Sequence, residues 1–174
     1  MQNNAWLYIC AFVMLIILMC GISCCKTCSR RVPFNYLALF TFTLCMSYVV
    51  AGICSYYDPV SVFAVTCMTT SMVVGLTFVG CFISDQKAGC IAGFSVALVF
   101  VLLPMIILSW FFYARVLFIC ISALIVLLSS IYIILDAHVI AKRLSVDEYI
   151  FGALTLYVDI IQLFLHLLAM FGEK

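Results

Sequence analysis

Residues 117–140 read LFICISALIVLLSSIYIILDAHVI, an unbroken run of 24 residues with one charged side chain, Asp136. About 20 apolar residues in a helix suffice to cross the roughly 30 Å hydrocarbon layer of a bilayer. The run lacks the alternation of apolar and polar residues that is typical of strands in a membrane barrel. It therefore predicts a membrane-spanning helix.

Five further runs have the length and composition of membrane spans. Nearly all charged and turn-forming residues lie in the short segments between the runs. The sequence therefore predicts an all-α polytopic membrane helix bundle with six transmembrane helices, which form a single domain over residues 1–174. The six predicted spans are residues 6–22, 36–56, 60–83, 91–113, 117–140 and 149–170.

The composition of the whole chain supports the same class. Of the 174 residues, 68% are hydrophobic and 9% are charged, whereas a soluble domain has about a quarter of its residues charged. This excludes soluble enzymes and disordered chains. A net charge of +1 without a basic run excludes a nucleic-acid partner and leaves the lipid bilayer as the expected surroundings.

Lysine and arginine residues are distributed unequally between the two sides of the predicted bundle. Because such residues gather on the cytosolic side of membrane proteins, the odd-numbered connections are expected in the cytosol and the N-terminus outside. The first, third and fifth connections hold six of them, Lys26, Arg30, Arg31, Lys87, Lys142 and Arg143, and the opposite side holds Arg115 and Lys174.

Two acids, Asp136 and Asp159, lie well inside apolar runs. A carboxylate at the bilayer centre costs roughly 2.5–3.5 kcal/mol on insertion scales, so such residues usually face the bundle interior. Asp136 lies about 9 Å along the helix before Lys142, and Asp159 about 15 Å after Tyr149. Both therefore lie in the cytosolic half of two helices joined by one short loop. We expect the pair to share a proton and to titrate as a unit.

Polar residues continue along the same helix faces as the two acids. On the last span Gly152, Thr155, Asp159, Gln162 and His166 fall within about 80° of arc. Thr155, Gln162 and His166 are therefore candidates to line an ion pathway. The alternative for this stripe, and for each acid, is interhelical hydrogen bonding that only fixes the packing.

Three other polar residues lie toward the predicted cytosolic side of the bundle. Arg30 and Arg31 are candidate counter-charges for the pair, with simple anchoring at the cytosolic interface as the alternative. His138, two positions from Asp136, points elsewhere on its helix and is expected at the membrane interface.

The C-terminal segment 147–165, DEYIFGALTLYVDIIQLFL, closely resembles the signature of the transmembrane BAX-inhibitor-motif family, Lifeguard branch. Further matching segments are 30–35, RRVPFN, then 55–57, SYY, and Leu135-Asp136. Members of the family form seven-helix bundles, and this chain aligns from the second family helix onward. The resemblance thus implies a bundle without a counterpart of the first family helix.

The resemblance also implies a function. The family is described as a pH-sensitive calcium leak of endoplasmic reticulum, Golgi and related membranes, and as a suppressor of cell death. Its paired aspartates correspond to Asp136 and Asp159, which would form the ion pathway, the pH sensor and a weak calcium site. The basic partner of the pair corresponds to Arg30 or Arg31. Calcium is then the permeant ion, with no cofactor, and membrane proteins of cell-death control are the expected partners.

The chain departs from the family pattern in two segments. The loop motif Gln-Thr-Lys-x-Asp-Phe-Thr is here residues 85–91, DQKAGCI, and Asp-Thr-Gln is here residues 136–138, DAH. Neither departure changes Asp136 or Asp159, but both are expected to alter gating or the choice of partners.

Two other functions remain open from the sequence. An intramembrane aspartyl protease also places two aspartates on adjacent helices. Such proteases carry a Gly-x-Gly-Asp motif, whereas Leu156, Tyr157 and Val158 precede the acid here, and we therefore expect no enzyme. The second alternative is a non-conducting interaction protein in which the acidic pair is purely structural.

Overall fold

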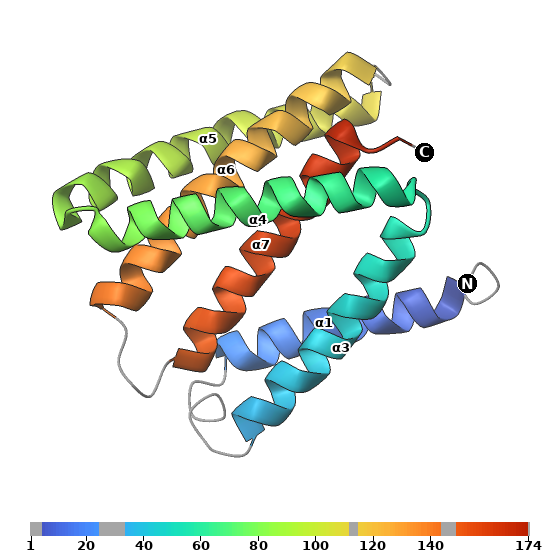
Figure 1. The fold of residues 1–174 in the computed structure, drawn as a ribbon, viewed down its shortest axis with the longest axis horizontal. Helices are drawn as coiled ribbons and strands as arrows, with labels where there is room; N and C mark the ends of the chain where they lie inside the picture. Colours follow the sequence, from blue (N-terminus) through green and yellow to red (C-terminus); the bar gives the residue numbers. More distant parts are fainter. Residues whose placement is uncertain (1–4, 25–33, 112–114, 144–148, 174) are drawn as a thin grey trace.

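The computed structural model describes residues 5–24, 34–111, 115–143 and 149–173. These residues form α-helices joined by short links and contain no β-strand (Figure 1). The helices are α1 (Ala5–Cys24), α3 (Phe34–Cys54), α4 (Pro59–Phe82), α5 (Asp85–Phe111), α6 (Arg115–Lys142) and α7 (Tyr149–Phe171).

The predicted all-α architecture with six helices is confirmed. Five of the helices contain segments long and apolar enough to cross a membrane, and the chain is an integral multi-pass membrane protein. These segments are Tyr36–Cys54, Pro59–Phe82, Asp85–Ile107, Val116–Lys142 and Gly152–Phe171.

The start of α5 differs from the prediction. Hydropathy placed the span from residue 91 onward and assigned Ser84 to Lys87 to a break, but the helix begins at Asp85. An acid in the first turn interacts favourably with the positive end of the helix dipole. The polar segment therefore forms the first turn of the helix, and the link between α4 and α5 is reduced to Ile83 and Ser84.

The start of α4 follows the expected turn chemistry. Asp58 is the N-cap and accepts a hydrogen bond from the backbone N–H of Val60 at 3.0 Å, and Pro59 occupies the first helical position. Proline is favoured there because its missing N–H has no partner within the helix in any case. The Asp58-Pro59 pair thus ends the link from α3 and begins α4.

Helix α6 packs against three other helices, α4, α5 and α7 (Figure 1). Ile133 of α6 is fully buried against Val65 of α4 and Leu163 of α7. A second cluster joins Leu128 of α6 to Leu102 of α5. Because α6 contacts three neighbours, the position of its side chains depends on several helices at once.

A third buried cluster connects the first two helices to the last. It contains Leu15 of α1, Phe42 of α3 and Leu154 of α7. The rings of Phe42 and Tyr157 meet edge to face, with centroids 6.2 Å apart. This contact attaches α1 and α3 to the rest of the bundle through α7.

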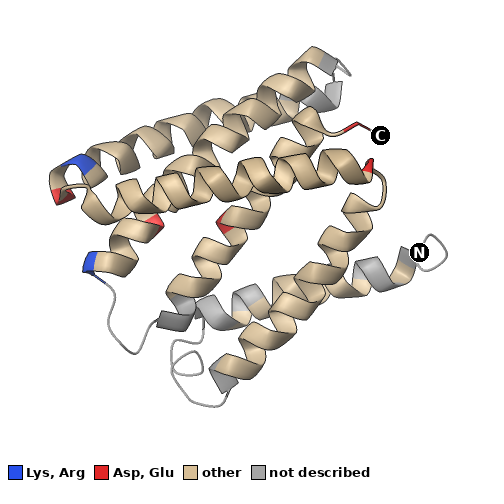
Figure 2. Cartoon of the chain, viewed as in Figure 1, with Lys and Arg blue, Asp and Glu red and all other residues tan. Residues whose placement is uncertain are grey.

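Apart from the acids within α6 and α7, the charged residues coloured in Figure 2 lie at the two ends of the bundle. Lys142 at the end of α6 binds the link between α4 and α5, Arg143 binds the first residue of α5, and these two residues with Lys87 define what we call the basic end. At the opposite end the backbone N–H of Asp58 donates to the carbonyl of Glu173. The separation agrees with helices that run from one side of a membrane to the other.

Candidate functional site

The two intramembrane acids lie on adjacent helices, Asp136 on α6 and Asp159 on α7, and both are half-buried. Helices α6 and α7 form the most extensive helix–helix contact among the described residues. The predicted pair therefore lies on two helices that pack against each other, and the contact between its two carboxyl groups stays a prediction.

Thr155 occupies a position where it serves both its own helix and the acids. Its hydroxyl group donates a hydrogen bond to the carbonyl of Gly152 at 3.0 Å. Gly152 is buried one turn earlier on the same face. Because the hydroxyl proton is used within α7, the Thr155 oxygen presents lone pairs to neighbouring groups.

The polar stripe of α7 has a burial gradient. Gly152 is buried, whereas Thr155, Asp159 and His166 are half-buried and Gln162 is exposed. Gln162 lies at one edge of the 80° arc, so the stripe follows the border of the contact between α6 and α7. Thr155 is thus beside the acids, while Gln162 projects outward.

Polar residues also recur every seven residues from α6 to the residue that follows it, at Ser122, Ser129, Asp136 and Arg143, and their exposure rises along the chain. Ser122 and Ser129 are buried, Asp136 is half-buried and Arg143 is exposed. The face therefore runs from the packed interior to the basic end, with Asp136 between the two. Arg30 and Arg31, the candidate counter-charges, lie outside the described residues.

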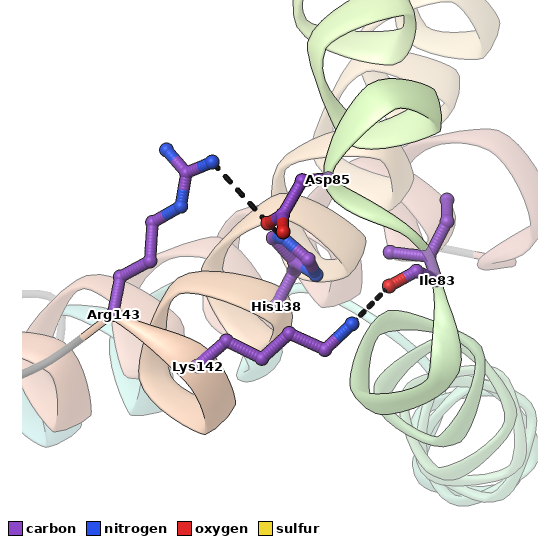
Figure 3. A network of polar contacts seen from close by, with 5 residues as sticks. All are labelled: Ile83, Asp85, His138, Lys142 and Arg143. Carbon is purple, nitrogen blue, oxygen red and sulfur yellow. Dashed lines mark hydrogen bonds and ion pairs between the residues drawn. The ribbon is translucent and has the colours of Figure 1, made fainter.

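A second polar cluster joins α6 to the start of α5 at the basic end (Figure 3). His138 Nε2 lies 2.9 Å from Asp85 Oδ1, and Arg143 Nη2 lies 3.2 Å from the same oxygen. The Lys142 ammonium group donates to the carbonyl of Ile83. We refer to Asp85, His138, Lys142 and Arg143 as the Asp85 cluster.

The structure gives the protein surroundings of His138. The side chain is only 2% exposed and is bound to Asp85, while its expected depth at the membrane interface stays a prediction. Since a carboxylate can only accept, Nε2 carries the proton of this hydrogen bond. One signal for the contact was present in the sequence, because Asp85 is an acid in a connection assigned to the same side as Lys142 and Arg143.

The described residues contain no group of three or more His, Cys, Asp or Glu side chains that would form a metal site. Calcium in proteins takes six to eight oxygen ligands. Asp136, Asp159 and Thr155 supply carboxylate and hydroxyl oxygens, which suits transient contact with a cation better than tight binding.

The whole chain, residues 1–174, matches the model of the protein family described as "Inhibitor of apoptosis-promoting Bax1". The chain belongs to this family. The membership confirms the resemblance inferred from segment 147–165 and its companions.

Relatives with curated names carry the Lifeguard designation. Protein lifeguard 4 of Mus musculus is 37% identical over 143 residues, which cover 78% of this chain and 57% of the relative. Protein LIFEGUARD 4 of Arabidopsis thaliana is 32% identical over 146 residues, 82% of this chain and 59% of the relative. Protein lifeguard 3 of Homo sapiens is 25% identical over 181 aligned positions, 99% of this chain and 58% of the relative. The chain thus spans less than two thirds of the length of these family members.

Proposed function

We propose that this protein is a pH-sensitive calcium leak in which Asp136 and Asp159 share a proton and control the passage of calcium. The observation that carries the proposal is that both acids are half-buried on α6 and α7, the two helices with the most extensive contact among the described residues. Two carboxylates brought together in a medium of low dielectric constant do not ionise independently. The pair therefore has a protonated form, which is neutral or singly charged, and a deprotonated form, which attracts a cation.

Polar side chains on the same face of α7 as Asp159 are the proposed lining of the ion route. Thr155 lies one turn before Asp159, and His166 continues this face of α7. Gln162 lies at the outer edge of that face, where it would contact an ion only near the surface of this helix pair. Arg30 and Arg31 remain the proposed counter-charges on the cytosolic side.

We further propose that the leak lowers calcium in an internal store, the endoplasmic reticulum or the Golgi, and thereby suppresses apoptosis. The plasma membrane is the alternative location. The family description names an inhibitor of apoptosis, which supports this role. Membrane proteins of cell-death control are the proposed partners, and neither an enzymatic activity nor a bound cofactor is part of the proposal.

Calcium flux through the purified protein in liposomes, measured between pH 5 and 8, tests the proposed leak. Wild type is expected to conduct calcium at a rate that changes with pH. Asp159→Asn removes one titrating group but keeps the shape of the side chain, so its rate is expected to be nearly independent of pH. Asp58→Asn is the matched control, since asparagine also caps helices and Asp58 lies at the opposite end.

The alternative of a non-conducting interaction protein predicts a different result. Wild type would then give no flux above that of empty liposomes, and Asp159→Asn would act only on assembly. If wild type and Asp159→Asn both conduct calcium with the same pH response, the protein is a leak but the acidic pair does not control it.

A further inference from the structure

The Asp85 cluster joins side chains from the last one and a half turns of α6 to the two-residue link between α4 and α5 and to the first residue of α5 (Figure 3). Lys142 binds a carbonyl group just beyond the end of α4, where the helix dipole is negative, and Asp85 lies in the first turn of α5, where it is positive. Each contact therefore matches the polarity of the helix end it binds. Together the contacts connect α4, α5 and α6 at one point.

The contact between His138 and Asp85 has opposing contributions. Asp85 is 65% exposed, whereas His138 is 2% exposed, and the Nδ1 atom of His138 is buried without a hydrogen-bond partner. The hydrogen bond to a carboxylate stabilises the contact, but the unpaired buried nitrogen destabilises it. A contact with such offsetting terms is suited to be released and formed again.

The position of His138 relative to Asp136 links the cluster to the acidic pair. Two residues along an α-helix correspond to a rotation of about 200°. The two side chains thus lie on nearly opposite sides of α6, with His138 against α5 and Asp136 on the face away from that contact, and α6 also packs extensively against α7. A helix held on one side at His138 is restrained in rotation, and the direction of Asp136 is fixed by that restraint.

We propose that Asp85, His138 and Arg143 are positioning residues, which form a releasable latch that holds α6 in the rotation at which Asp136 meets Asp159. The effect on calcium rests on the proposed leak, whereas the effect on the geometry of α6 does not. Release of the latch leaves the basic end of α6 free to turn, so that the two carboxyl groups separate and become accessible to small reagents.

The first experiment measures the latch itself by thermal unfolding of the full chain in detergent. Asp85→Ala, His138→Ala and the double variant form a cycle. The loss of Tm in the double variant is expected to be clearly smaller than the sum of the two single losses. Losses that simply add would show that the two side chains do not act together and would overturn the proposal.

The second experiment measures the accessibility of the acidic pair with a hydrophobic carbodiimide, followed by mass spectrometry of the segments that contain Asp136 and Asp159. Asp85→Ala is expected to raise labelling several-fold over wild type. Asp85→Asn keeps an oxygen that accepts from His138 and is expected to restore most of the protection. Gln86→Ala, an exposed neighbour, is the control and should label like wild type.

A milder variant keeps the test decisive if Asp85→Ala does not fold. Arg143→Gln removes one largely exposed contact with Asp85 and is expected to raise labelling by a smaller factor. Unchanged labelling in both Asp85→Ala and Arg143→Gln would overturn the positioning role, whatever their stability.

Calcium flux separates this proposal from the proposed function. Asp85→Ala in liposomes is expected to leak calcium several-fold faster than wild type and Gln86→Ala at the same pH. If wild type shows no flux but the labelling changes as expected, the leak is refuted and the positioning role stands. If wild type conducts and Asp85→Ala neither leaks faster nor labels more, the latch is refuted and the leak stands.

Discussion

At the scale of single residues, placing an acid inside the bundle costs free energy, and this cost can be measured. A carboxyl group inside the membrane is disfavoured by roughly 2.5–3.5 kcal/mol on insertion scales. Asp136 and Asp159 are both half-buried on α6 and α7, so this cost applies to each of them.

Asp159→Asn is therefore expected to leave the Tm of the protein unchanged or to raise it. The amide retains hydrogen-bonding capacity but has no charge to desolvate. Thermal unfolding in detergent near neutral pH, with Asp58→Asn as the control, measures the effect. A marked fall in Tm for Asp159→Asn alone would indicate that the acids hold the helices together, as the packing alternative states.

The sequence located the two acids but not their neighbours. Depth along the membrane follows from counting residues to the nearest loop, and on this basis both acids were predicted in the cytosolic half of their helices. The contact of His138 with Asp85 depends on the lateral arrangement of α4, α5 and α6. Periodicity within one helix contains no information on which neighbour lies beside it, so this contact required the structure.

At the scale of helices, α4 approaches α6 closely at Gly80. A Cβ atom on Gly80 would lie 2.6 Å from the carbonyl oxygen of Ile134 and 2.7 Å from the Cβ of Ala137. Small residues at such crossings allow close van der Waals packing, which is a main source of association between helices in lipid. This crossing lies on the segment of α6 that carries both Asp136 and His138.

Gly80→Ala is expected to destabilise the bundle by about 1–3 kcal/mol, the usual range for overpacking. The neighbours are a backbone carbonyl group and a short side chain, so neither has room to yield. Gly75→Ala on the same helix is the matched control, because nothing lies within 4 Å of its added Cβ. Equal unfolding temperatures for the two variants would contradict the tight crossing.

The N-terminal cap of α4 gives a second prediction at this scale. Asp58→Ala removes the side chain that accepts from Val60, which costs about 0.5–2 kcal/mol for a typical cap. Asp58→Asn should retain most of the stability. Unfolding of both variants in detergent checks the difference, and equal losses would show that the cap contributes nothing.

Helix number was predictable from the sequence, whereas one helix boundary was not. Long apolar runs determine the existence of a helix here: all six predicted runs form helices, and five of these helices contain a segment long and apolar enough to cross a membrane. The apolar run that begins at residue 91 is shorter than α5, because the helix already begins at Asp85 and includes Gln86 and Lys87. Hydropathy identifies the apolar residues that are stable inside a bilayer, whereas capping and packing determine where a helix begins and ends.

At the scale of the whole molecule, charge is organised along the helix axes. Lys87, Lys142 and Arg143 share the basic end, and Asp58 and Glu173 meet at the other end. The positive-inside preference then directs the basic end to the cytosol. With this orientation the Asp85 cluster lies on the cytosolic side of the acidic pair.

Lys87 is accordingly expected to react with a membrane-impermeant amine reagent only from the cytosolic face of sealed vesicles. It is exposed in the first turn of α5, so its reactivity reports the side and not the fold. Lys174 serves as the comparison from the opposite side. If Lys87 is labelled in sealed vesicles that expose only the non-cytosolic face, the orientation is the opposite of the one stated here.

We propose above that Asp136 and Asp159 act as one proton-sharing unit in calcium passage. The most direct measurement is calcium flux through liposomes at several pH values for wild type, Asp136→Asn, Asp159→Asn and the double variant. A shared unit predicts that each single variant already loses the pH response and that the double variant loses no more. Two independent partial losses that add in the double variant, or a wild-type pH response retained in any of the variants, would contradict the claim.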